Sequence, residues 1–341
     1  MDAVLNHMDG NAPLFQLYGD DYDASPWFYL FTGENWGFPD LDQEAPALQR
    51  YARDVIRYWS REYRVDGYRY DATRWVGWEG YNDYGASWFA WCGRQADPDS
   101  FQIAEHLPSD PNLVNNTEMD AGWSVEFRWR ICDTLKEGRF DTNEMLRLLH
   151  PTTTGFSNAL QNVIYTESHD EERTAAELAQ RYTPEETTRR AIAAIVLTLT
   201  APGIPMLYAG QEWGEATPKI VGHNPLHPQQ RNIEPTQTIY QNTRELCRLR
   251  TRNAALKGDH LEVLRADGER GLLVYRRAAA PQEVLVAVNA GHTPQEVDFP
   301  LSPGVWRAVP GRALLRIQTP VSLTRNLLPG ESLVMEKMQT D

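Results

Sequence analysis

The chain has 341 residues, of which 41% are hydrophobic and 23% charged, as is typical of a globular protein with ample core. Its net charge is −14 and it has no basic tract. This charge argues against nucleic acid or a membrane as a partner and suits a neutral substrate. The three widely spaced cysteines argue against a disulfide framework or a zinc site and favour a reducing compartment. We therefore expect a cytoplasmic protein.

The first part of the chain alternates predicted strands and helices. Residues 2–7 predict a buried strand, and residues 8–43 form a loop-like stretch rich in glycine, aspartate, proline and aromatic residues. Apolar side chains at helical spacing predict a helix over 44–63. The later predicted strands are 65–71, 101–105, 162–167 and 203–208, and the later predicted helices are 81–95, 127–137, 184–201 and 239–250.

The helix over 184–201 has a clear start signal, because residues 183–186 (TPEE) form a capping box with proline at the first helical position. After residue 252, short strands at 261–263, 272–275 and 284–288 indicate a small all-β domain. The alternation before it implies a parallel sheet of the (β/α) barrel type. We therefore expect a barrel domain over 1–252, with a loop insertion at about 8–43, and a β-sandwich-like domain over 253–341.

Residues 65–71 (VDGYRYD) hold the first chemical candidates. Alternation along a strand places Arg69 and Asp71 on the same face, and Gly67 allows neighbouring backbone to approach closely. A guanidinium beside a carboxylate keeps the carboxylate ionised, as a carboxylate nucleophile requires. The alternative is a structural Arg–Asp pair at a strand end.

Two more carboxylates, Glu105 and Asp170, follow later strands, and His7 and His169 also lie at strand ends. Barrels place their chemistry at the carboxyl ends of their strands, so we expect Asp71, Glu105 and Asp170 to converge. Repulsion among them is expected to raise the pKa of the least solvated one, giving a protonated acid beside an ionised nucleophile. That pair is the equipment of a retaining glycosidase. No zinc-type spacing of histidine and cysteine appears, which disfavours metal catalysis.

Several tryptophans lie on either side of the Asp71 strand, in segments that we expect to be connections. Their exposed faces would suit stacking against sugar rings, and core packing is the alternative for each of them. These residues are Trp27, Trp36, Trp75, Trp78, Trp88 and Trp91.

Six motifs, in order along residues 2–213, resemble those of glycoside hydrolase family 13, the α-amylase superfamily. Four of them are at 2–7, 67–71, 103–105 and 168–170, and residues 38–42 and 203–208 resemble the family's Pro-Asp-Leu motif and last barrel strand. The resemblance implies Asp71 as nucleophile, Glu105 as general acid/base and Asp170 as the residue that stabilises the transition state. It also implies three substrate-binding residues, which are Arg69, His7 and His169.

The first of these motifs resembles the family's third barrel strand. The resemblance therefore implies a (β/α)8 TIM-type barrel that lacks its first two β/α units, and we expect a fragment of a longer sequence or, as the alternative, a truncated gene with an open barrel. Asn6 and Asp40 match calcium positions of the family, but Trp75 stands where calcium-type amylases carry a histidine. No cofactor is expected to be required, and calcium binding is the alternative.

The resemblance implies an α-glucan or malto-oligosaccharide as substrate and attack on α-1,4-glucosidic bonds through a glycosyl–enzyme intermediate. Residues 123–129 and 166–172 resemble glucan branching enzymes, so a transglycosylase is the alternative to a hydrolase. Two readings from other classes are a catalytically inactive fragment and a carbohydrate-binding protein.

Overall fold

The computed structural model describes residues 1–18, 21, 24–29, 37–78, 84–219 and 224–338. The chain forms two compact units. The first consists of Met1–Ser124, Gly155–Ser157 and Gln161–Val163, and the second consists of Val125–Thr154, Asn158–Leu160 and Ile164–Asp341.

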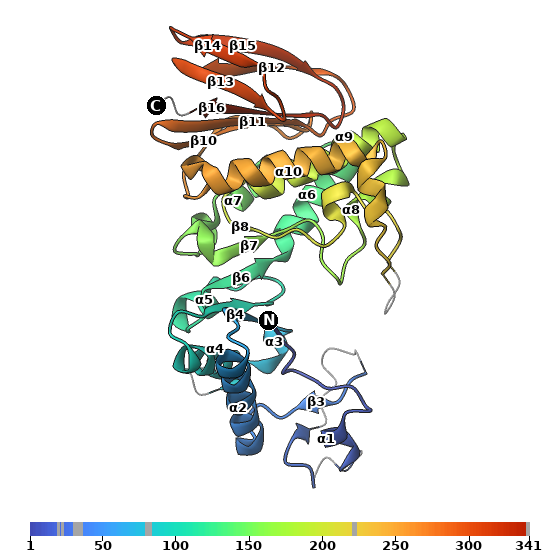
Figure 1. Ribbon diagram of the computed structural model, residues 1–341, viewed down its shortest axis with the longest axis vertical. Coiled ribbons are helices and arrows are strands. Elements are labelled where there is room, and N and C mark those ends of the chain that lie inside the picture. Colours follow the sequence, from blue (N-terminus) through green and yellow to red (C-terminus); the bar gives the residue numbers. More distant parts are fainter. Residues whose placement is uncertain (19–20, 22–23, 30–36, 79–83, 220–223, 339–341) are drawn as a thin grey trace. The chain divides into compact units, whose positions relative to one another are not determined.

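The first unit contains a parallel sheet with helices packed against it (Figure 1). In this sheet β1 pairs with β4, β4 with β5, and β5 with β6, all in parallel, while β2 and β3 form a separate antiparallel pair. Its elements are β1 (Asp2–Ala3), α1 (Pro13–Gln16), β2 (Phe28–Tyr29), β3 (Asp40–Leu41), α2 (Pro46–Glu62), β4 (Gly67–Tyr70), α3 (Thr73–Val76), α4 (Gly85–Ala96), β5 (Phe101–Ala104), α5 (Pro111–Asn116) and β6 (Ala121–Ser124).

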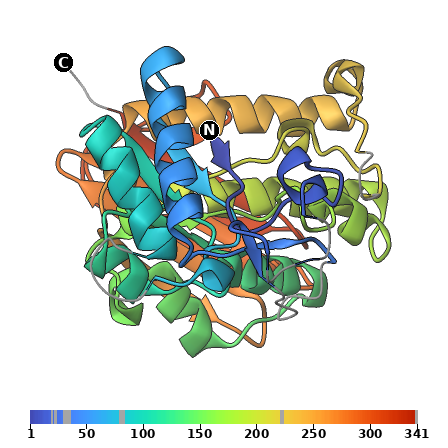
Figure 2. The ribbon, with the colours of Figure 1, turned by 90° about the horizontal axis from the view of Figure 1, so that it is seen from below.

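Alternation along β4 divides its side chains between a core and a polar face. Tyr68 and Tyr70 are buried, and the Tyr68 hydroxyl donates to the carbonyl of Ile56 on α2 at 2.6 Å. The Tyr70 hydroxyl donates to Gln102 Oε1 at 2.7 Å. The two helices that cover these tyrosines, α2 and α4, lie side by side in both views (Figure 1 and Figure 2). The predicted helix over 44–63 is therefore confirmed, and α2 buries its apolar stripe as its spacing requires.

Gly67 begins β4 at a point where no side chain fits. A Cβ atom built on Gly67 would lie 2.0 Å from the carbonyl oxygen of Phe101. The close backbone approach predicted from the sequence is thus confirmed, and β4 and β5 pair in register from this glycine onward.

The predicted buried strand over 2–7 is wrong beyond Ala3. After β1 the chain turns away from the sheet, and the carbonyl of Asn6 accepts from the Leu41 amide at 2.9 Å. His7 forms an isolated antiparallel bridge with Asp40, and Val4 is exposed. Residues 6–8 therefore hydrogen-bond to the 39–41 segment, which is distant in sequence, instead of continuing the pairing of β1 within the sheet.

The second unit contains the remaining α/β elements and all the C-terminal strands (Figure 1). Its α/β elements are α6 (Val125–Glu137), α7 (Thr142–Leu149), the end of β7 (Asn162–Ile164), α8 (Thr174–Ala179), α9 (Pro184–Thr200), β8 (Ile204–Pro205) and α10 (Thr236–Arg252). Short 3₁₀ helices cover Pro151–Thr154, Ala159–Gln161, Gln211–Trp213, Pro228–Asn232 and Ala254–Leu256. β7 ends before Glu167 and β8 ends before Tyr208, so both are shorter than the sequence predicts.

Helix α9 has partners at both ends. Thr183 is its N-cap, and the Thr183 side chain accepts from the Glu186 amide at 3.3 Å, as the capping box predicts. At the other end, the Arg277 guanidinium donates to the Thr200 carbonyl at 2.6 Å and Arg250 donates to the Ala201 carbonyl at 3.0 Å. These arginines satisfy carbonyls that have no partner within the helix and also complement its dipole.

The C-terminal strands are all antiparallel and enclose their own core. One sheet has the order β14-β13-β16-β11-β10-β9, and β12 pairs with β15 in a second sheet. Trp306, Phe299 and Leu285 are among the fully buried residues between them. The strands are β9 (Leu261–Asp267), β10 (Leu272–Ala279), β11 (Gln282–Asn289), β12 (Gln295–Leu301), β13 (Gly304–Val309), β14 (Leu314–Ile317), β15 (Val321–Leu327) and β16 (Ser332–Met338).

The predicted fold class is confirmed. In the first unit β1, β4, β5 and β6 pair in parallel in the chain order of a (β/α) barrel sheet, and the second unit carries the all-antiparallel C-terminal strands.

Four of the six tryptophans around β4 pack against a hydrophobic core. Trp88 and Trp91 lie on α4, not in a connection, and their rings stack with centroids 5.0 Å apart. They pack with Trp78 against the core of the first unit, while Trp27 packs against the small core beside α2. Trp75 lies on α3, and Trp36 falls outside the described residues.

Candidate active site

Arg69 links the two carboxylates of the first unit. Its Nη1 donates to Asp71 Oδ1 at 2.7 Å, and its Nη2 forms an ion pair with Glu105 Oε1. Asp71 directly follows β4 and Glu105 directly follows the neighbouring strand β5, which explains why one guanidinium reaches both. Carboxyl groups that bind the two terminal nitrogens of one guanidinium are close neighbours. A retaining glycosidase requires such closeness, because its two carboxyl groups lie about 5 Å apart.

The surroundings of Arg69 favour its charge. The side chain is 11% exposed, stands over the Trp123 ring at 4.7 Å, and also donates to Asp2 Oδ1 at 2.7 Å. Burial by itself would lower the pKa of Arg69, but the charges of Glu105, Asp2 and Asp71 outweigh it and raise the pKa above its ordinary value. The guanidinium is therefore a fixed cation between the two candidate catalytic groups.

Glu105 is held by backbone groups as well as by Arg69. Its Oε2 accepts from the Ala72 amide at 3.0 Å, and its carbonyl accepts from the Thr73 amide and the Thr73 hydroxyl, each at 2.9 Å. Ala72 has a φ of 49°, a left-handed conformation that a residue with a Cβ rarely adopts. Strain of this kind is concentrated at functional sites, and at Ala72 it aims the amide at the Glu105 carboxylate.

The sequence analysis missed the contact between Arg69 and Glu105. It paired Arg69 with Asp71 alone, because alternation within one strand says nothing about the next strand. A raised pKa for one of the carboxylates, expected from their mutual repulsion, stays a prediction.

The other candidates of the first unit gather around Asp40. Beside the bridge between His7 and Asp40, Asn6 Nδ2 lies 3.2 Å from His7 Nδ1, and the His7 ring stacks on Phe38 with centroids 5.0 Å apart. Asn6 and Asp40 are each only 4% exposed and supply oxygen atoms, the donors that calcium prefers. Calcium binding at these two residues stays a prediction.

His169 and Asp170 belong to the second unit, in the loop after β7. His169 Nε2 lies 3.3 Å from Asp170 Oδ2, and the two side chains are 48% and 58% exposed. The Asp170 amide donates to Ser168 Oγ at 3.1 Å, which closes a tight turn in the loop. The structure therefore groups Asp71, Glu105 and Arg69 in one unit and His169 and Asp170 in the other, and convergence of all three carboxylates stays a prediction.

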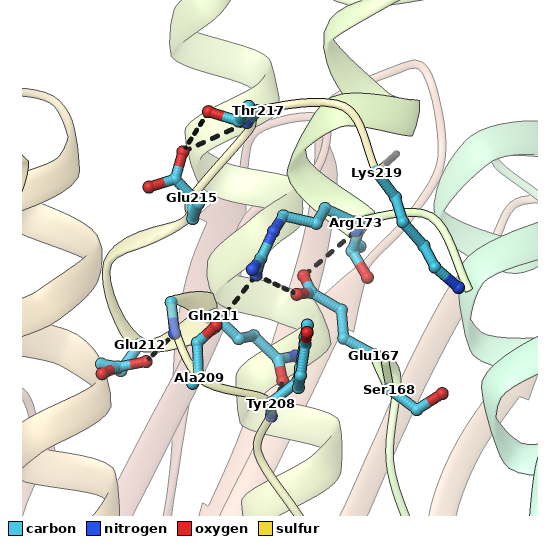
Figure 3. A network of polar contacts seen from close by, with 12 residues as sticks. Glu167, Ser168, Arg173, Tyr208, Ala209, Gln211, Glu212, Glu215, Thr217 and Lys219 are labelled. Carbon is cyan, nitrogen blue, oxygen red and sulfur yellow. Dashed lines mark hydrogen bonds and ion pairs between the residues drawn. The ribbon is translucent and has the colours of Figure 1, made fainter. Parts of the chain in front are cut away.

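A buried polar network surrounds the base of the Asp170 loop, and the sequence analysis did not single it out (Figure 3). Glu167 and Arg173 form an ion pair at 3.4 Å with side chains only 2% and 3% exposed. Glu167 directly precedes the motif at 168–170, and Arg173 lies three residues after it. Two opposite charges on either side of a motif were the sequence signal that could have predicted this pair.

In the described part of the chain, no helix is both long and apolar enough to cross a membrane.

Known proteins match most of the chain. The family model "Alpha amylase, catalytic domain" matches residues 6–260. A cyclomaltodextrinase of Bacillus sp is 24% identical over 319 residues, a match that covers 86% of this chain and 54% of that protein. The intracellular maltogenic amylase of Bacillus subtilis (strain 168) is 24% identical over 324 residues, covering 88% of this chain and 52% of that protein.

Among solved structures, an α-amylase from Geobacillus thermoleovorans complexed with acarbose has the same fold, with a TM-score of 0.77 and 20% identity. That match covers 100% of this chain and 77% of the other. The chain spans about half the length of the curated relatives it matches. The names of these relatives do not favour the branching-enzyme alternative. The family model covers well over half of the sequence, in agreement with the motif resemblance, and the chain therefore belongs to the α-amylase family, glycoside hydrolase family 13.

Proposed function

We propose that the chain carries the catalytic machinery of a retaining glycoside hydrolase that cleaves α-1,4-glucosidic bonds in α-glucans or malto-oligosaccharides. The observation that carries the proposal is the Asp71–Arg69–Glu105 group, in which two carboxylates at the ends of neighbouring strands share one buried guanidinium. Membership of the α-amylase family supplies the substrate class.

In this mechanism Asp71 attacks the anomeric carbon, and its ion pair with Arg69 orients the attacking carboxylate. Glu105 protonates the leaving oxygen and afterwards removes a proton from the attacking water, with its carboxylate oriented by the Ala72 amide. Asp170 stabilises the positive charge that develops on the sugar ring in the transition state. His7 and His169 hydrogen-bond sugar hydroxyls.

The names of the relatives support hydrolysis of maltodextrins over branching. Cyclomaltodextrinases and maltogenic amylases are named for such substrates and products. A cytoplasmic location is part of the proposal, supported by three free cysteines and by a relative named as intracellular. Calcium, if bound at Asn6 and Asp40, would hold the chain beside β3 and would take no part in bond cleavage.

The test is amylose turnover by the chain, with reducing ends and iodine colour followed together. Hydrolysis increases the number of reducing ends while the iodine colour fades, whereas branching weakens the iodine colour without creating new reducing ends. The Asp71→Asn variant should keep the fold and lose turnover. Full activity in that variant would overturn the assignment, and an inactive but folded chain would favour the non-catalytic fragment.

A further inference from the structure

The loop that carries His169 and Asp170 is closed at its base by the buried Glu167–Arg173 pair. Glu167 lies just before the 168–172 loop and Arg173 just after it, so their ion pair at 3.4 Å brings the two ends of the loop together. Glu167 Oε1 also accepts from the Thr174 amide at 3.0 Å, and the Thr174 hydroxyl donates to the Thr166 carbonyl at 3.1 Å. The base of the loop is thus fastened by both side chains and backbone.

Arg173 also fastens this loop to the chain that follows β8. Its Nη1 donates to the Ala209 carbonyl at 3.0 Å, and its guanidinium stands 4.8 Å from the centre of the Tyr208 ring. Glu172 Oε1 accepts from the Lys219 amide at 2.9 Å, which adds a second connection. Figure 3 shows Arg173 between Glu167 and the Tyr208–Ala209 segment, so one side chain joins two loops.

The loop itself carries His169 and Asp170, whose side chains lie 3.3 Å apart. His169 and Asp170 are about half exposed, and the Asp170 amide is held by Ser168 Oγ. Exposed side chains of this kind take their position from the backbone beneath them. The orientation of Asp170 therefore depends on how firmly the base of the loop is held.

Glu167 and Arg173 are also an unfavourable choice if stability alone is considered. Moving both charges out of water is costly, and apolar residues of similar size often stabilise a protein as well or better. Burial raises the pKa of Glu167 to about 7 in spite of the opposing charge of Arg173. Ion pairs and hydrogen bonds are directional, so this pair fixes the position of the loop ends more tightly than apolar contacts would.

We propose that Glu167 and Arg173 are positioning residues that hold His169 and Asp170 in the orientation needed for catalysis by clamping the 168–172 loop to the chain after β8. The inference rests on the proposed function, in which Asp170 stabilises the transition state. Neither side chain touches substrate, and their effect on the reaction is exerted through Asp170.

The test compares Arg173 with a matched control, Arg190. Arg190 is equally buried, ion-paired with Glu186 at 2.7 Å, and bonded to the Leu135 carbonyl at 2.7 Å, but it contacts neither loop. Each arginine is replaced by lysine and by methionine, and kcat and KM for maltoheptaose are measured well below each variant's Tm. Arg173→Met should lower kcat by about 100-fold with little change in KM, because a displacement near 1 Å costs this much. Arg173→Lys should recover part of the loss.

The control separates positioning from general stabilisation. Arg190→Lys and Arg190→Met should lower Tm while kcat of the folded protein stays within about twofold of the wild type. If Arg173→Met lowers Tm in the same way and leaves kcat unchanged, the pair is merely structural and the inference fails. If Asp170→Asn and Asp71→Asn remain fully active, the proposed function itself is wrong, which is a different outcome.

A second measurement does not depend on turnover. Hydrogen exchange of the Asp170 amide should accelerate by about tenfold or more in Arg173→Met, since the clamp that protects the loop is lost. It should stay at the wild-type rate in Arg190→Lys. Unchanged exchange in Arg173→Met would overturn the inference even if the chain proved inactive.

Discussion

Replacing Glu167 with glutamine should make the free energy of unfolding less dependent on pH. Burial raises the pKa of Glu167 from its ordinary value of 4.5 to about 7, and the charge of Arg173 only partly offsets this. Between these two values the folded chain holds a proton that the unfolded chain has released. Stability from this group is therefore fully present below about pH 4.5 and is lost as the pH rises towards about 7.

The size of the effect follows from the two pKa values. The interval from 4.5 to about 7, at about 1.4 kcal/mol per pKa unit, corresponds to about 3 kcal/mol. Glutamine has a similar shape and does not ionise, so Glu167→Gln should remove this pH dependence and leave that of every other group in place. The difference in unfolding free energy between variant and wild type should then grow by about 3 kcal/mol across this interval.

The assay is urea unfolding of both proteins at several values between about pH 4.5 and about pH 8. Glu269→Gln, which removes a charge from an exposed position, serves as the control for the loss of one carboxylate. Parallel pH profiles for wild type and Glu167→Gln would refute the reasoning, because they would mean that the buried carboxylate costs the fold nothing when it ionises.

Three further predictions concern other parts of the chain. Glu105→Gln should lower kcat in reducing-end assays by about 10²- to 10⁴-fold, as the loss of a general acid/base does, while the variant stays folded. Arg277→Met should lower the unfolding free energy by at least about 1–3 kcal/mol, measured with urea, because carbonyls of Thr200 and Gly258 lose their buried partner. If calcium binds at Asn6 and Asp40, a chelator should lower Tm in thermal unfolding, Asp40→Asn should remove that response, and equal Tm values with and without chelator would exclude a stabilising ion there.

Some features were determined by local sequence alone. The period of two along 67–71 places Tyr68 and Tyr70 in the core and leaves Arg69 and Asp71 on the opposite face. The capping box at Thr183 specifies the start of α9, and the apolar stripe of α2 specifies its buried face. These features depend on residues a few positions apart, and their rules of spacing hold whatever the rest of the chain does.

Other features depended on residues distant in sequence. The strand predicted over 2–7 ends at Ala3 because the following backbone finds partners at 39–41. Trp88 and Trp91 of α4 pack against a core that is built from residues of the sheet and of other helices. Local patterns cannot choose between two satisfactory partners for the same residue, so only the folded chain decided these cases.

The sequence by itself determined the family, because the order and spacing of its motifs identify the α-amylase family, and it proposes Asp71, Glu105 and Asp170 as the catalytic groups. Only the tertiary structure decided how two of these groups are held. It places Glu105 as well as Asp71 on Arg69, and it joins Glu167 to Arg173 beneath the Asp170 loop. The physical reason is that ion pairs between neighbouring strands and loops depend on distances in space, which the spacing of residues along the chain does not contain.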